Sequence, residues 1–139
     1  MSYKGLQRLT GTLRALAEVP SRASADAAAR IGELVQESFD SGTDPYGRPW
    51  ASLAASTQAR GRRPPPLTDS GAMRGSVVVS ALSGAGIAVT IGAAYATFHQ
   101  TGTRHMPQRQ ILPQSGGLAP SWRKAIADAV AANIRKALD

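Results

Sequence analysis

The sequence predicts an α+β domain in which a small antiparallel β-sheet is flanked by helices, with long Gly/Pro-rich loops and a C-terminal amphipathic helix. Two β-rich runs, 76–82 and 87–92, are joined by Ser-Gly-Ala-Gly, which favours a hairpin. Apolar residues recur with helical spacing at both ends of the chain, and most of the 14 glycines and 9 prolines lie between them. Because 139 residues suit one domain, we assign residues 1–139 to a single domain.

Two helices are predicted before residue 40. The first, over 1–20, has four leucines on one stripe at three- and four-residue steps: Leu6, Leu9, Leu13 and Leu16. Pro20 is expected to end this helix, because proline cannot continue one. The second helix is predicted over 24–39, and Ser21 or Ser24 is expected to cap its start.

The middle of the chain is predicted to alternate loops with short elements. Residues 40–50 are dense in turn formers and are expected to form an ordered loop that places Tyr46 and Trp50 against the core. Residues 58–66 form a basic, Pro-rich arm, which we expect to be mobile because its composition buries little apolar area. A short helix is predicted within 67–74.

The segments after the hairpin end in the clearest helix of the sequence. Residues 95–102 predict one helical turn that ends at Gly102, and residues 104–117 predict a loop containing a short strand. The last helix is predicted over 120–138, with Pro120 near its start. Its apolar residues follow strict four-residue steps: Trp122, Ile126, Val130, Ile134 and Leu138.

The net positive charge lies entirely in the second part of the chain. The formal net charge is +7, and residues 1–57 sum to zero, so the whole excess lies in 58–139. This asymmetry favours an acidic or polyanionic partner. The plainer alternative is a charged surface that keeps the protein in solution.

Composition excludes several functional classes. The chain has no cysteine, which rules out a disulfide framework, a thiolate nucleophile and a Cys-based metal site. With two histidines, an all-histidine metal site is not expected either. No apolar run approaches the roughly 20 residues that span a bilayer, and the N-terminus lacks a secretory signal core. We therefore expect a soluble, intracellular product with no cofactor and no membrane partner.

The sequence offers little for catalysis. His99 and His105 are the two candidate imidazole bases. His99 lies in an apolar segment, which is typical of a structural histidine with satisfied hydrogen bonds, and His105 lies in a basic loop that disfavours its protonated form. Asp40 and Asp44 lie among turn formers, where capping explains an aspartate. No phosphate-binding loop or nucleophile elbow is present, so an enzyme is not expected.

Three separated motifs together resemble one family. The first is Asp44, Gly47 and Trp50, followed by Leu53 and Ser56-Thr57, similar to D-x-x-G-x-x-W-x-x-L-x-x-S/T. The second runs from Leu67 through Ser70 and Gly71 to Met73, similar to L-x-x-[ST]-G-x-L with Met73 in the place of leucine. The third is Tyr95, Ala96, His99, Gln100 and Gly102, then Pro107, Arg109 and Leu112, similar to Y-A-x-x-H-Q-x-G followed by P-x-R-x-x-L.

In this order and spacing, the motifs resemble the phage virion morphogenesis, or tail completion, proteins of Mu-like and related tailed phages. The resemblance covers about 31–138, although the family's long basic loop between the first two motifs is short here. It implies a structural virion protein, without catalysis, that completes the head-proximal end of a tail and joins it to a DNA-filled head. It also implies a homo-oligomeric neck ring, with six subunits matching tail symmetry, made in the host cytoplasm.

The partners that the resemblance implies are a head-side connector and a tail tube or terminator protein, with nonspecific contact to packaged DNA. Five arginines are candidates to line a DNA channel or to meet an acidic connector: Arg60, Arg62, Arg63, Arg104 and Arg109. Alternatively, Arg109 pairs with a carboxylate of its own fold. The expected interface elements are the 40–50 loop, the basic arm and the 101–117 loop.

Two rival functions come from other classes. The first is a small basic protein that binds nucleic acid without sequence preference; the arginines of the arm lack aromatic neighbours, which favours contacts with phosphate over contacts with bases. The second is a hydrolytic enzyme that uses His99 or His105.

Overall fold

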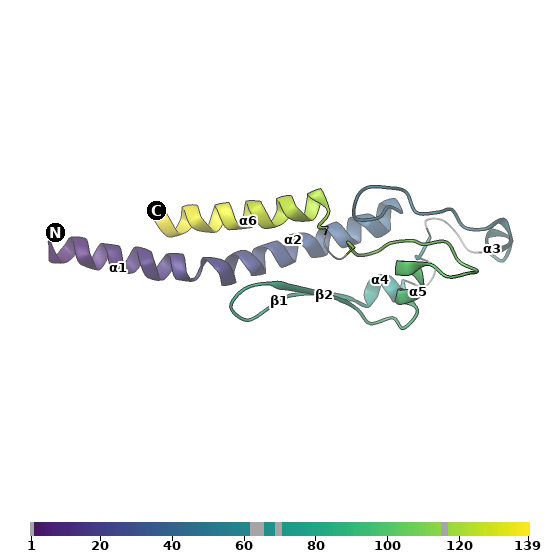
Figure 1. Ribbon diagram of the computed structural model, residues 1–139, viewed down its shortest axis with the longest axis horizontal. Helices are drawn as coiled ribbons and strands as arrows, with labels where there is room; N and C mark the ends of the chain where they lie inside the picture. Colours follow the sequence, from purple (N-terminus) through teal and green to yellow (C-terminus); the bar gives the residue numbers. More distant parts are fainter. Residues whose placement is uncertain (1, 62–65, 69–70, 115–116) are drawn as a thin grey trace.

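The computed structural model describes residues 2–61, 66–68, 71–114 and 117–139. Helices and a two-stranded antiparallel sheet confirm the α+β class. Along the chain the elements are α1 (Tyr3–Ala17), α2 (Val19–Ser41), α3 (Ala55–Ala59), α4 (Ala72–Gly75), β1 (Val77–Ala81), β2 (Ile87–Ile91), α5 (Ala96–Thr101) and α6 (Pro120–Leu138). Figure 1 shows an elongated molecule in which α2 runs between α6 and the hairpin, with α1 at one end and the loops at the other.

The boundary between the first two helices differs from the prediction. α1 ends at Ala17, and Pro20 lies in the first turn of α2 instead of closing α1. Proline is tolerated there because the first amides of a helix have no partner within it. α2 therefore starts before Ser24, and neither predicted serine caps it. Ser24 Oγ instead donates to Pro20 O at 2.7 Å and accepts from Gly86 N at 2.9 Å, which ties α2 to the hairpin turn.

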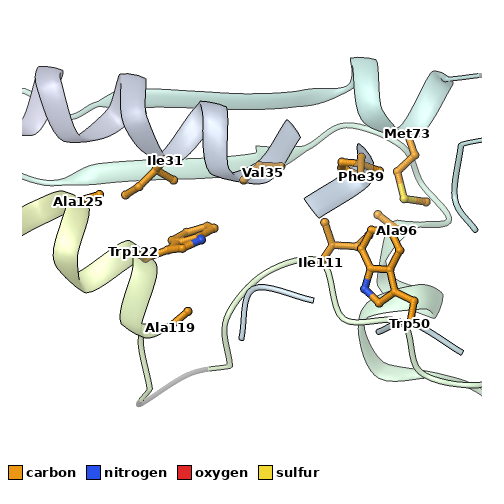
Figure 2. Packing of buried hydrophobic residues seen from close by; sticks show 10 residues of the cluster. All are labelled: Ile31, Val35, Phe39, Trp50, Met73, Ala96, Ile111, Ala119, Trp122 and Ala125. Carbon is orange, nitrogen blue, oxygen red and sulfur yellow. The ribbon is translucent and has the colours of Figure 1, made fainter. Parts of the chain in front are cut away.

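The core lies along one face of α2. Ile31, Val35 and Phe39 are almost fully buried there. Figure 2 shows how these side chains meet residues from the loops and from α4, α5 and α6, namely Trp50, Met73, Ala96, Ile111 and Trp122. The Phe39 and Trp50 rings pack edge to face, with 5.6 Å between centroids. The predicted anchoring role of Trp50 is thereby confirmed.

The predicted hairpin is confirmed and supplies the second layer of the core. Val79 pairs with Val89 in an antiparallel register, and the Leu82 amide donates to Gly86 O at 2.9 Å across the turn. The side chains of Val77, Val79 and Val89 pack against the core cluster. Alternate residues of β1 face solvent, as period-2 geometry requires.

α6 has the predicted bounds but a different buried face. It buries Trp122, Ala125, Ala129 and Asn133, whereas the C-terminal part of the predicted four-residue stripe is exposed. A four-residue step overshoots one helical turn by about 40°, so such a stripe drifts around the helix. Small residues of α6 and α2, among them Ala129, Ala23 and Ala27, instead form the close contact between the two helices.

Among the predictions for the remaining short elements, some are confirmed and others are wrong. α5 ends at Gly102, as predicted, and α4 places Met73 in the core. The strand predicted within 104–117 is absent from the described part of that loop, which holds an isolated bridge between Thr103 and Met106. The first residues of the predicted arm, 58 and 59, complete α3. None of the helices in the described ranges has the length and apolarity to cross a membrane.

Candidate functional site

The turn of the first motif is shaped by a carboxylate. Asp44 is buried, and its Oδ1 accepts hydrogen bonds from the amides of Tyr46 and Arg48, both at 2.9 Å. Its Oδ2 accepts from Arg48 Nε at 2.9 Å. Gly47 has a φ of 87°, a region that side chains disfavour. Asp44 and Gly47 thus fix the turn, which matches the turn-capping explanation given above for aspartates in this loop.

Trp50 then fastens this loop to the loop after α5. Its indole Nε1 donates to Gln110 O at 2.7 Å, across 60 residues of sequence. Tyr46 Oη makes a second link by donating to Gly117 O at 2.6 Å and accepting from Gln114 N at 3.1 Å. The loop of the first motif and the loop of the third therefore form one connected unit.

The Gln100 side chain holds two parts of the third motif together through hydrogen bonds to the backbone. Its Oε1 accepts from the amides of Ile111 and Leu112 at 2.8 and 2.9 Å, and its Nε2 donates to Leu112 O at 2.8 Å. One side chain thus pairs three backbone groups of a segment that has no regular structure. At Gly102, with a φ of 75°, a Cβ atom would lie 3.0 Å from Gln108 N. Glycine is therefore required there by both conformation and space.

Arg109 is buried between the two loops. Its Nε donates to Ala51 O at 2.7 Å, its Nη2 donates to Ser52 O at 2.9 Å, and its backbone amide donates to His99 O at 2.8 Å. Burial lowers the pKa of the guanidinium from its ordinary value. Among the described residues the partners of its guanidinium are backbone carbonyls, and its burial does not match the expected position in an open channel.

His99 differs from the satisfied structural histidine that the sequence predicts. Its Nδ1 is buried and has no hydrogen-bond partner among the described residues. Its ring meets the Tyr95 ring edge to face, with 6.1 Å between centroids. Burial first, and then the nearby positive charge of Arg109, lower the pKa of the imidazole. The ring is therefore neutral at neutral pH and is poorly suited to bind an anion.

The other candidate residues are on the surface or outside the described ranges. Arg60 follows α3, Arg104 follows α5, and both are exposed. Tyr95 and Pro107 are exposed as well. Gly71 precedes α4 with a φ of 74°, which explains its place in the second motif. Arg62 and Arg63 lie outside the described residues.

A groove that sequence reasoning did not find opens beside the connected loops. It has a volume of about 590 Å³, and Leu112, Leu118 and Trp122 supply apolar lining from separate segments. Arg123, in the first turn of α6, is the charged residue of its described lining. No local pattern marks these residues, because the groove exists only once the loop after α5 lies against α6.

The model of the Phage virion morphogenesis family matches residues 2–135, almost the whole chain. No curated protein and no solved structure matches the chain. The matched range includes all three motifs, and side chains of the first and third shape the connected loops. On this evidence the chain belongs to the phage virion morphogenesis family.

Proposed function

We propose that this protein completes the head-proximal end of a phage tail and joins the tail to the head as a subunit of a homo-oligomeric neck ring. Family membership suggests a structural, virion-associated protein rather than an enzyme. The observation that supports this specific role is that side chains of the motifs bind backbone groups of the loops. Asp44, Trp50, Gln100 and Arg109 hold backbone groups of two loops in one fixed shape, as a docking surface requires.

The charge distribution supports an acidic partner at the loop end. Nine basic and two acidic residues lie between 41 and 127, whereas the rest of the chain carries seven of each. Arg60 and Arg104 are exposed within this positive part. We propose that they meet an acidic surface of the head-side connector or the phosphates of DNA in the channel, while a tail tube or terminator protein binds elsewhere on the ring.

Deleting the gene from the parent phage tests the joining role directly. Electron microscopy of the lysate should show DNA-filled heads and separate tails, and complementation in trans should restore joined, infectious particles. Intact particles in the deletion lysate would contradict the proposal and would favour the rival of a nucleic-acid-binding protein.

The same complementation assay tests the positive surface. A gene carrying Arg60→Ala and Arg104→Ala is expected to lower the titre of joined particles roughly tenfold, which corresponds to about 1.4 kcal/mol of lost interaction. The control carries Arg22→Ala and Arg135→Ala, which remove the same charge from the helical end. Equal titres for the two double variants would refute the assignment of the arginines at the loop end.

A further inference from the structure

The outer edge of β2 carries backbone groups without partners. The Gly92 amide, just after β2, donates to Ser76 O at 3.0 Å. Because hydrogen bonds alternate along an antiparallel pair, Ile87, Val89 and Ile91 direct their amides and carbonyls away from β1. Among the described residues, these outward groups have no hydrogen-bond partner. Such an edge can pair with a further strand.

This edge lacks the features that usually prevent pairing. Edge strands are commonly protected by charged residues, by proline or by a bulge. Neither strand of the hairpin contains a charged residue or a proline. The register runs without a bulge from the pair of Val77 and Ile91 to the pair of Ala81 and Ile87. The edge of β2 is therefore available to an additional strand.

The edge of β2 borders the groove described above. Val89 belongs to the groove lining, together with Leu112, Leu118 and Trp122. Leu118 is 45% exposed, so apolar surface of the groove faces solvent. Successive side chains of a strand point to opposite faces, so a segment paired with β2 can direct every second side chain into the groove. The volume of about 590 Å³ is large enough to hold such side chains.

The charge at the groove selects the kind of segment. Arg123 is the charged residue of the described lining, and it is exposed. Its guanidinium has no ion-pair partner within the described ranges. α6 begins beside it without a side-chain cap and without an acidic residue in its first turn, so the positive end of the helix dipole adds to this charge. A carboxylate on a bound segment would therefore be attracted.

This chain offers no such carboxylate in an extended segment. The groove lining comes from within 70–127, which contains no aspartate and no glutamate. The described acidic residues lie in or directly beside α2 and α6, except Asp44, which is buried in its turn. DNA, in turn, has neither apolar side chains nor a backbone that pairs with a strand. These observations favour a different protein as the occupant.

We propose that an extended segment of another virion protein adds to β2 as a third strand, places apolar side chains in the groove and pairs a carboxylate with Arg123. The inference rests on the joining role proposed above, because joining requires contact with other virion proteins. It adds a contact that is separate from Arg60 and Arg104, which lie outside the groove lining.

Photo-crosslinking in phage particles tests the occupant. A gene in which p-benzoylphenylalanine replaces Leu118 complements the deletion, and the particles are irradiated. We expect an adduct with another virion protein, and mass spectrometry should map the crosslink to a segment that carries an aspartate or glutamate. The matched control has the same replacement at Leu82, which is 50% exposed and lies outside the groove lining. The control should give at least about tenfold less of this adduct.

Two further variants test the role of Arg123. In the protein labelled at 118, Arg123→Ala should lower the adduct about tenfold, because the carboxylate loses its partner. The control Lys124→Ala removes the same charge from the next residue, which lies outside the groove lining and pairs with Asp128 at 2.6 Å. Both side chains are exposed, so both variants should fold. Equal amounts of adduct from the two variants would refute the pairing with Arg123.

Three other outcomes would overturn the inference. They are no adduct at 118 in particles, an adduct with a second copy of this chain, and an adduct whose crosslinked segment carries no carboxylate. The gene deletion separates this inference from the joining role. Unjoined heads and tails together with any of these outcomes would leave the joining role intact, whereas intact particles in the deletion lysate would contradict the joining role itself.

Discussion

Gln100 and His99 are neighbours in the chain, and each affects its stability in a different way. The Gln100 amide satisfies three backbone groups of 111–112, so it contributes net hydrogen-bond energy. The His99 ring is packed beside Tyr95 with its Nδ1 unpaired, so its charged form is disfavoured in the fold. Each effect leads to a separate measurement.

Gln100→Ala should lower the free energy of unfolding by about 2–3 kcal/mol, because two partly buried amides lose their acceptor and the Leu112 carbonyl keeps only its bond from Gln110 Nε2. The control is Gln108→Ala, which removes one exposed hydrogen bond, from Gln108 Nε2 to Gln100 O, and should cost less than about 1 kcal/mol. Urea unfolding of both variants provides the comparison. Equal losses would show that Gln100 does not organise the loop.

Stability should fall as the pH is lowered from 7.5 to 5.5. The pKa of His99 is lower in the folded state than its ordinary value of about 6.5, so the unfolded chain binds the proton more readily. The full stability is therefore present above about pH 6.5 and is lost as the pH falls toward the folded pKa. Thermal midpoints for wild type and His99→Gln provide the test. The variant should lack this part of the decline, and identical slopes would contradict the assignment.

α1 and α2 follow each other directly but differ in what holds them. α2 buries eight residues, including Ile31, Val35 and Phe39, whereas α1, described along its full length, buries none. Short helices without tertiary packing are marginal in water. α1 therefore depends on a partner surface far more than α2 does.

Amides of α1 should exchange with solvent deuterium much faster than those of α2 over 31–39 in the dilute subunit, because local opening of α1 exposes no core. Mass spectrometry of peptides from both helices measures this difference. Equal protection of the two helices would show that α1 is held by its own chain as firmly as α2 is.

Exposed apolar residues and motif residues lie toward opposite ends of the elongated molecule. The long helices carry the exposed apolar stripes, and the loops carry most of the motif residues (Figure 1). The net charge of +7 belongs to 41–127, which includes the loops, and the remaining chain is neutral. In the role proposed above, the loop end meets the head.

Local signals in the sequence determined the elements that depend on a few neighbouring residues. The turn at 83–86 specified the hairpin, Gly102 ended α5, and Pro120 began α6, because backbone preferences act over short distances. The three motifs also predicted the family. Tertiary packing alone decided that Arg109 is buried against carbonyls more than 50 residues away and that α1 leaves Leu6, Leu9 and Leu13 exposed. Burial depends on which distant segments meet, and no local pattern encodes that.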